Sequence, residues 1–149
     1  FDRGAPASAS CFFVCETRED YLEEALDYYP AIRAVNADIP AEQTILCIGE
    51  HRAYYFKPRL IISDWFDTPA ILDLIRKTKS NAEIFEILQK QNCRHIFFNK
   101  GELSKYHNPY FRPRFSDDEY RRFVEFMESP RLVLKSKIGE VYIYRINEE

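Results

Sequence analysis

Three short apolar runs, separated by segments with helical periodicity, constrain the fold of this chain more than any other feature. The runs cover residues 44–48, 60–63 and 95–98. They lack the alternation of a half-exposed strand, so each run indicates a strand that is covered on both faces. We therefore expect the three strands to lie side by side and parallel, between layers of helices.

Capping signals predict where several helices begin. A Ser or Thr followed three residues later by an acid has the spacing of a capping box. Such pairs occur at Thr17 with Asp20, Ser80 with Glu83, and Ser116 with Glu119. Thr68 and Pro69 have the pattern of an N-cap and a first helical residue for a helix over residues 70–77. The last helix carries the clearest apolar stripe, which consists of Tyr120, Phe123, Val124 and Met127.

The remaining segments are shorter or irregular. Pro30 either ends the first helix or begins a second helix over residues 31–35. Residues 51–57 have room for about two turns of helix, and the segment after residue 98 is expected to be a long aromatic loop. Residues 132–137 and 140–146 alternate around Gly139, which predicts a terminal hairpin.

Together these elements predict an α/β fold. We expect a three-layer sandwich with a mostly parallel, Rossmann-like sheet that ends in an antiparallel hairpin. Residues 1–16 are expected to be a linker or lead-in, and residues 17–149 a single α/β domain, since this length can bury its own core. The chain begins with Phe1 rather than Met, so we expect it to be a piece of a longer protein.

Composition argues against several classes of function. A net charge of −3 gives no general attraction to nucleic acid, and no window approaches the roughly 18 to 20 apolar residues of a membrane span. Where a dinucleotide-binding fold would need G-x-G-x-x-G, the turn after the first strand has I-G-E-H-R-A. We expect no cofactor and no nucleic-acid partner.

The four cysteines lack the spacing of a structural zinc site, and no metal site is expected. Cys47 and Cys93 lie in or beside apolar runs, where buried free thiols are expected. Free thiols fit a reducing compartment better than an oxidising one. Whether Cys11 and Cys15 form a disulfide stays open.

Polar residues follow each of the three expected strands. In open α/β sheets, ligands bind beyond the carboxyl ends of the parallel strands, so these residues could meet at one edge and hold a sugar or a phosphate. The candidate ligand-binding residues are Glu50, His51, Arg52, Asp64 and Asn99. The alternative is that they only cap the strand ends. Ligand binding predicts that Glu50→Gln and Arg52→Ala weaken binding without greatly lowering the melting temperature.

Other candidate chemistry is weaker, and no catalytic residue is assigned. Ser63, His51 and Asp64 could form a hydrolase triad in principle, but Ser63 has no G-x-S-x-G elbow. His95 is expected to be a satisfied residue at a strand end, and His107 to be exposed or in contact with a partner. The basic triplets at residues 57–59 and 112–114 are expected to be solvated, or to meet anionic lipid headgroups if the domain is tethered to a membrane.

The order of these landmarks resembles a known family. T-R-E-D-Y-L (residues 17–22), V-N-A-D-I-P (35–40), I-L-C-I-G-E-H-R-A-Y-Y-F (45–56) and C-R-H-I-F-F-N (93–99) follow one another as in the C-terminal tails of bacterial multi-spanning glycosyltransferases of the GT-C type. These enzymes are relatives of dolichyl-phosphate-mannose protein mannosyltransferases and of enzymes that glycosylate lipid A. The resemblance covers residues 17–146, and no single motif in it is diagnostic.

The resemblance implies a non-catalytic domain on the periplasmic face of the inner membrane. In that family the transmembrane part binds the polyprenyl-phosphate sugar and carries the catalytic acid, so no catalytic residue is carried over. The tail would assist acceptor recognition or cover the membrane active site. Its partners would be the transmembrane portion of the same polypeptide and a lipid-linked sugar or glycan acceptor. The alternative is a freestanding α/β module that binds a nucleotide or a sugar phosphate.

Overall fold

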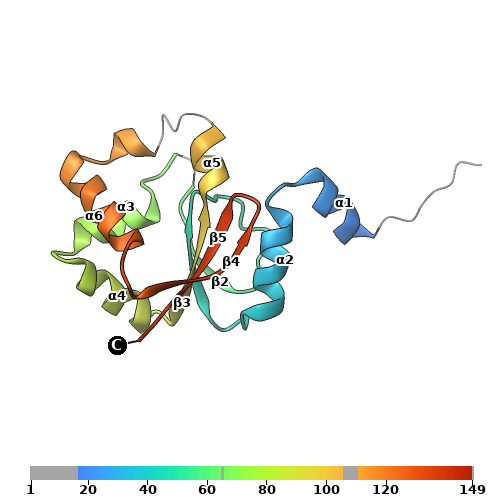
Figure 1. Ribbon diagram of the computed structural model, residues 1–149, viewed down its shortest axis with the longest axis horizontal. Coiled ribbons are helices and arrows are strands. Elements are labelled where there is room, and N and C mark those ends of the chain that lie inside the picture. The colour runs from blue at the N-terminus through green and yellow to red at the C-terminus, as the bar shows by residue number, and fades with distance from the viewer. Residues whose placement is uncertain (1–16, 65, 106–110, 149) are drawn as a thin grey trace, which may run out of the picture.

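The computed structural model describes residues 17–64, 66–105 and 111–148 (Figure 1). Its helices are α1 (Arg18–Ala25), α2 (Tyr29–Asp38), α3 (Ala70–Lys77), α4 (Asn81–Lys90), α5 (Lys100–Lys105) and α6 (Asp117–Met127), with a 3-10 turn η1 (Arg112–Arg114). Its strands are β1 (Thr44–Ile48), β2 (Arg59–Ile61), β3 (Cys93–Asn99), β4 (Leu132–Ile138) and β5 (Val141–Ile146). None of the helices in these ranges is long and apolar enough to cross a membrane.

The strands form one five-stranded sheet in the order β2-β1-β3-β5-β4. The expected parallel neighbours are confirmed, because β1 pairs in parallel with both β2 and β3. The terminal hairpin is confirmed as well, and β5 joins it antiparallel to β3. The sheet is therefore mixed rather than mostly parallel, since the hairpin adds two antiparallel pairings to the two parallel ones.

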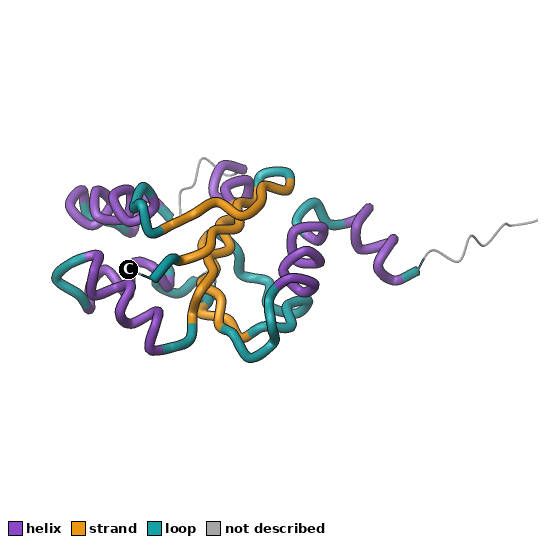
Figure 2. The backbone as a smooth tube through the Cα atoms, turned by 60° about the horizontal axis from the view of Figure 1, so that its bottom comes forward, coloured by secondary structure: helices purple, strands orange, loops and turns teal. Residues whose placement is uncertain are grey.

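Helices lie on both faces of the sheet (Figure 2). Successive side chains of β1 point to opposite faces. Leu46 and Ile48 pack in the core under α3, α4 and α6, whereas Ile45 and Cys47 pack against α2. Burying one such side chain contributes about 1.5 to 3 kcal/mol, so both faces of the central strands stabilise the fold.

The helices begin mostly as their capping signals predict. Complete capping boxes occur at Thr17 and Ser116, and Pro30 lies in the first turn of α2, so it begins a helix rather than ending one. The prediction for Thr68 is wrong, because Pro69 occupies the N-cap of α3 and the Ser63 hydroxyl accepts a hydrogen bond from the Ala70 N–H.

Three other predictions need correction. Residues 51–57 form turns but no helix, and β2 is a half-exposed edge strand rather than a buried one. The segment after β3 is not a plain loop, because it contains α5 and η1. Of the other elements, α1 buries little of its surface: Tyr21 is 61% exposed, and of the helix only Leu22 is buried.

Candidate functional site

Polar residues meet at the edge of the sheet where β1, β2 and β3 end. The three strands are parallel neighbours, so their carboxyl ends share this edge. Glu50 follows β1 after one glycine, and its side chain is fully buried. A group of residues in contact forms around it through hydrogen bonds, ion pairs and one cation–π contact, and we call it the rim cluster: Tyr28, Glu50, Arg52, Asn99 and Glu102.

Both carboxylate oxygens of Glu50 are engaged inside the protein. Oε1 accepts hydrogen bonds from the backbone N–H groups of His51 and Arg52, both at 3.0 Å, and from Arg52 Nε at 2.7 Å. Oε2 accepts from the Arg52 guanidinium and from Asn99 Nδ2, both at 2.9 Å. A buried carboxylate is tolerated only with such partners, so Glu50 joins the ends of β1 and β3.

Arg52 is the most exposed member of the rim cluster. Its side chain is 38% exposed, lies 3.5 Å from the centre of the Tyr28 ring, and approaches Glu102 Oε1 at 3.4 Å. Burial acts to lower the pKa of Arg52, but the hydrogen bonds and charge of Glu50 outweigh it and raise that pKa. Burial also raises the pKa of the Tyr28 hydroxyl. Arg52 therefore stays cationic beside a neutral phenol.

Gly49 and Asn99 explain why the chain turns tightly here. Gly49 has φ +76°, and a Cβ at this position would lie 2.6 Å from the Asn99 carbonyl oxygen and 2.8 Å from Leu103. Only glycine fits such a close approach in a left-handed conformation. Asn99 Oδ1 accepts a hydrogen bond from the Glu102 N–H at 3.1 Å, which caps the start of α5.

His51 and Ser63 hold the neighbouring strand end. His51 Nδ1 lies 2.8 Å from the backbone carbonyl oxygen of Ser63, and the Ser63 hydroxyl accepts from the Ala70 N–H at 3.3 Å. The imidazole thus contacts the backbone carbonyl of Ser63, whereas the Ser63 hydroxyl accepts a hydrogen bond from the first residue of α3. This is not the hydroxyl-to-imidazole bond that a nucleophilic serine requires.

Asp64, the remaining candidate, makes no hydrogen bond to Glu50 in the described part of the structure. It is exposed, its carbonyl oxygen accepts from the Asp67 N–H at 3.2 Å, and it is not among the partners of Glu50 described above. The structure therefore brings Glu50, Arg52 and Asn99 into one cluster, places His51 next to it through its backbone, and leaves Asp64 outside it.

An open cavity of about 460 Å³ adjoins the rim cluster. Tyr28 and Asn99 belong to both the cavity and the cluster, and the other polar side chains on its wall are Asp27 and Glu140. Tyr28 and Asn99 are themselves buried, so the exposed carboxylates of Asp27 and Glu140 are the acceptors that this wall offers to hydroxyl groups. Sequence reasoning missed Tyr28, since its contact with Arg52 depends on how α2 packs. Glu102 could have been found, because Asn99 and Glu102 have capping-box spacing.

The other positions singled out in the sequence have varied outcomes. His95 is half-buried, and its Nδ1 is buried without a hydrogen-bond partner, so the expectation of a satisfied histidine is wrong. Arg112 pairs with Asp117, and Arg114 bonds to the carbonyl oxygens of Phe66 and Asp67, so this basic triplet is engaged internally. Cys11, Cys15, Trp65 and His107 lie outside the described residues.

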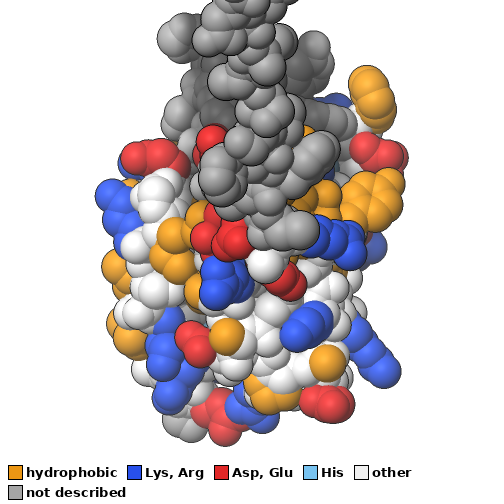
Figure 3. Space-filling view, turned by 90° about the vertical axis from the view of Figure 1, so that its right-hand side faces the viewer, with side chains coloured by type: hydrophobic (Ala, Val, Ile, Leu, Met, Phe, Trp, Pro, Cys, Tyr) orange, Lys and Arg blue, Asp and Glu red, His pale blue; other side chains and the backbone are white. Residues whose placement is uncertain are grey.

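Neither the charges on one face of the molecule nor its described metal-ligating side chains indicate a further site. On the face seen in Figure 3, Lys and Arg side chains alternate with Asp and Glu rather than forming a patch of one sign. Within the described ranges, no group of three or more His, Cys, Asp or Glu side chains could hold a metal ion.

Comparisons with known proteins show similarity of fold without similarity of sequence. No protein-family model matches the chain, and no curated protein matches it. Among solved structures, the fold is similar to the C-terminal globular domain of an oligosaccharyltransferase, AglB, from Archaeoglobus fulgidus. The likeness has a TM-score of 0.55 at 13% identity, and it covers 82% of this chain and 97% of that domain. The chain therefore shares its fold with the globular domain of an enzyme of glycan transfer.

Proposed function

We propose that this chain is the extracytoplasmic domain of a membrane glycosyltransferase that uses a polyprenyl-phosphate-linked sugar, and that the domain itself is non-catalytic. The observation that carries the proposal is the shared fold with the globular domain of an oligosaccharyltransferase, over most of both chains. The order of sequence landmarks supports the same class of enzyme independently. Its location would be the periplasmic face of the inner membrane.

The rim of the sheet is where this domain would meet a glycan. Glu50 accepts hydrogen bonds from Arg52, and Asn99 in turn donates to Glu50, so we assign both a positioning role. Arg52, with His51 and Asp64 on the neighbouring loops, would offer the polar contacts, and the cavity beside Tyr28 would receive a sugar ring. The partners would be the transmembrane portion of the same polypeptide and a lipid-linked sugar or glycan acceptor.

Two roles fit this arrangement. The domain would assist acceptor recognition, or it would cover the active site in the membrane. Both leave the chemistry to the transmembrane part, in agreement with the geometry at Ser63, whose hydroxyl caps α3 instead of meeting an imidazole. Both also require the rim to face that part.

Topology reporters on the full-length protein test the proposal. Alkaline phosphatase fused after Glu149 is active only outside the cytoplasm, whereas green fluorescent protein fused there fluoresces only inside it. We expect active phosphatase, and an upstream coding sequence with about ten or more apolar segments of membrane length. A soluble, fluorescent fusion without such segments would contradict the proposal and leave the freestanding module, whose binding of a nucleotide or sugar phosphate would then be measured directly.

A further inference from the structure

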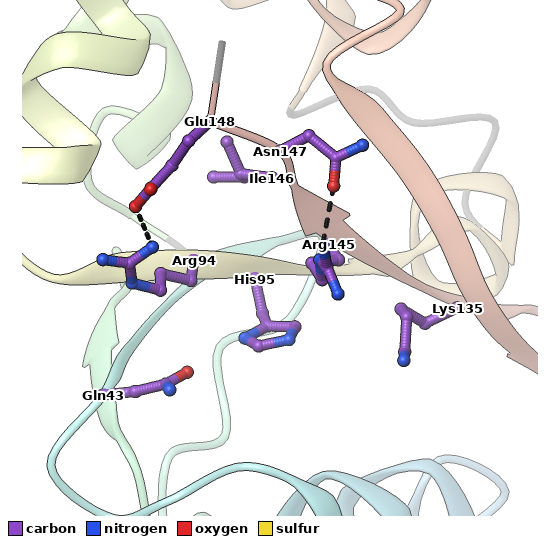
Figure 4. A pocket seen from close by; sticks show the side chains of 8 residues that line it. All are labelled: Gln43, Arg94, His95, Lys135, Arg145, Ile146, Asn147 and Glu148. Atoms are coloured by element: carbon purple, nitrogen blue, oxygen red, sulfur yellow. Dashed lines mark hydrogen bonds and ion pairs between the residues drawn. The ribbon is translucent and has the colours of Figure 1, made fainter.

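A second polar pocket lies at the opposite edge of the sheet, where β1 and β3 begin. It is an open cavity of about 650 Å³, and Gln43, Arg94, His95, Lys135, Arg145 and Glu148 are among its lining residues (Figure 4). An adjoining cavity of about 540 Å³ under the end of α2 shares His95 and Lys135 and adds Asp38. The pocket is far along the strands from the rim cluster, and the inference drawn from it does not depend on the function proposed above.

The sheet itself brings the basic side chains together. His95 on β3 and Arg145 on β5 are directly opposite each other in the antiparallel pairing, so their side chains share one face. Lys135 lies on β4 where the register shifts between Leu134 and Ser136. The irregularity takes Lys135 out of the regular alternation, and Figure 4 shows its side chain beside Arg145 and His95.

The charges of this pocket are not balanced within the protein. Arg94 pairs with Glu148, and Arg145 donates only through Nε, to Asn147 Oδ1 at 3.3 Å. In the described structure neither the Lys135 ammonium nor the terminal nitrogens of Arg145 have a hydrogen bond or an ion pair. Three cations and one carboxylate line the cavity, which leaves a net charge of +2 with His95 neutral. Arg52 and Arg76, by contrast, each meet a carboxylate.

His95 carries the second unusual feature of this pocket. Its Nδ1 is buried without a partner, and unpaired buried polar atoms are uncommon in folded proteins because they lose their hydration without compensation. Burial, followed by the charges of Lys135, Arg145 and Arg94, lowers the pKa of His95. The acidic groups nearby, Glu148 and Asp38, do not reverse this effect.

We propose that this pocket binds the phosphate group of a ligand, held by Lys135 and Arg145 with a hydrogen bond from His95. The donors come from three neighbouring strands, β3, β5 and β4, so three separate groups line the cavity. A phosphate presents up to four oxygens and can accept from all three groups, whereas a carboxylate has only two oxygens. The cavity is also large enough for the group to which the phosphate is attached.

Histidine NMR on the 149-residue chain tests the proposal directly. The chain has three histidines, so His51 and His107 serve as internal references for His95. Inorganic phosphate at constant ionic strength should neutralise Lys135 and Arg145 and raise the pKa of His95, with its acid dissociation constant falling about tenfold. The other two histidines should shift much less.

Variants distinguish a site from general screening by salt. Lys135→Ala and Arg145→Gln change exposed side chains and should fold, and each should weaken the apparent affinity for phosphate at least about tenfold. Lys137→Ala is the matched control, because Lys137 lies on the same strand but over the Tyr142 ring. The proposal is overturned if acetate shifts His95 as much as phosphate does, or if the control weakens binding equally.

The source of the phosphate needs a separate pair of measurements. Glycerol phosphate represents a soluble ligand, and flotation with phosphatidylglycerol vesicles, compared with phosphatidylcholine vesicles, represents a lipid headgroup. Capture by phosphatidylglycerol that Lys135→Ala abolishes assigns the site to a lipid, and binding of glycerol phosphate alone assigns it to a soluble ligand. If inorganic phosphate, glycerol phosphate and the vesicles all fail to bind, there is no phosphate site.

Discussion

At the scale of single residues, Glu50 decides how the sheet edge is organised. A carboxylate beyond a parallel strand can be a ligand-binding residue or a cap of the strand end, and the sequence alone leaves both roles open. In the structure its two oxygens accept five hydrogen bonds from three residues, and none of its side chain is exposed. Its direct contribution is therefore to stability and to the orientation of Arg52.

This geometry changes the expected effect of Glu50→Gln. The amide has nearly the same shape but removes the negative charge, and its NH₂ group would face donors. We expect the free energy of unfolding in urea to fall by about 2 to 4 kcal/mol. Glu86→Gln on the exposed side of α4 is the control and should stay within about 0.5 kcal/mol of the unchanged chain. Unaltered stability in Glu50→Gln would mean that the carboxylate is available to a ligand after all.

At the scale of elements, the turn that follows β1 packs closely against α5. The sequence indicated a turn at Gly49 but not the element that the turn touches. That element is α5, which begins where Asn99 caps the Glu102 N–H and which brings Leu103 against Gly49. The glycine is required by the close approach as well as by its positive φ.

Comparing Gly49 with Gly139 separates the effect of close approach from the effect of a positive φ. Gly49 and Gly139 both have positive φ, but only at Gly49 would a Cβ meet neighbouring atoms, because nothing lies within 4 Å of one at Gly139. We expect Gly139→Ala to lower the free energy of unfolding by about 1 kcal/mol and Gly49→Ala by about 3 kcal/mol or more. Chemical denaturation of both variants checks this. Equal losses would show that α5 moves aside without cost.

At the scale of the whole molecule, the two helical layers protect one free thiol each. Cys47 packs on the α2 face, and Cys93 packs in the core under α3, α4 and α6. Burial raises the pKa of Cys47 well above its usual value and that of Cys93 to about 12. A thiol that is buried and protonated reacts slowly, so these cysteines are compatible with an oxidising compartment as well as a reducing one.

Thiol labelling measures whether both layers open together. In a Cys11→Ser, Cys15→Ser variant, only Cys47 and Cys93 remain to react with a disulfide reagent. At neutral pH we expect both to react at least about a thousandfold more slowly than in concentrated guanidinium chloride, and at similar rates, because one sheet carries both layers. Rapid reaction of one thiol alone would show that its layer opens independently.

The sequence by itself determined the elements of this protein and much of their arrangement. The periodicity, the capping pairs and the unalternating apolar runs fixed β1, α3, α4, α6 and the hairpin, because these signals act between residues close in the chain. The rules of chain connection predicted that β1, β2 and β3 are parallel neighbours. The same rules predicted that their carboxyl ends share one edge, where Glu50 meets Asn99.

Tertiary structure alone decided what those side chains do. The burial of Glu50, the contact of Arg52 with Tyr28 and the meeting of His95, Lys135 and Arg145 each join segments far apart in the chain. Such contacts depend on strand order, on the packing of α2 and on the register shift in β4. None of these features produces a recognisable pattern among residues close in the sequence. Local physics selects the elements, whereas the packing of the elements determines which charges are satisfied inside the protein and which remain available to a ligand.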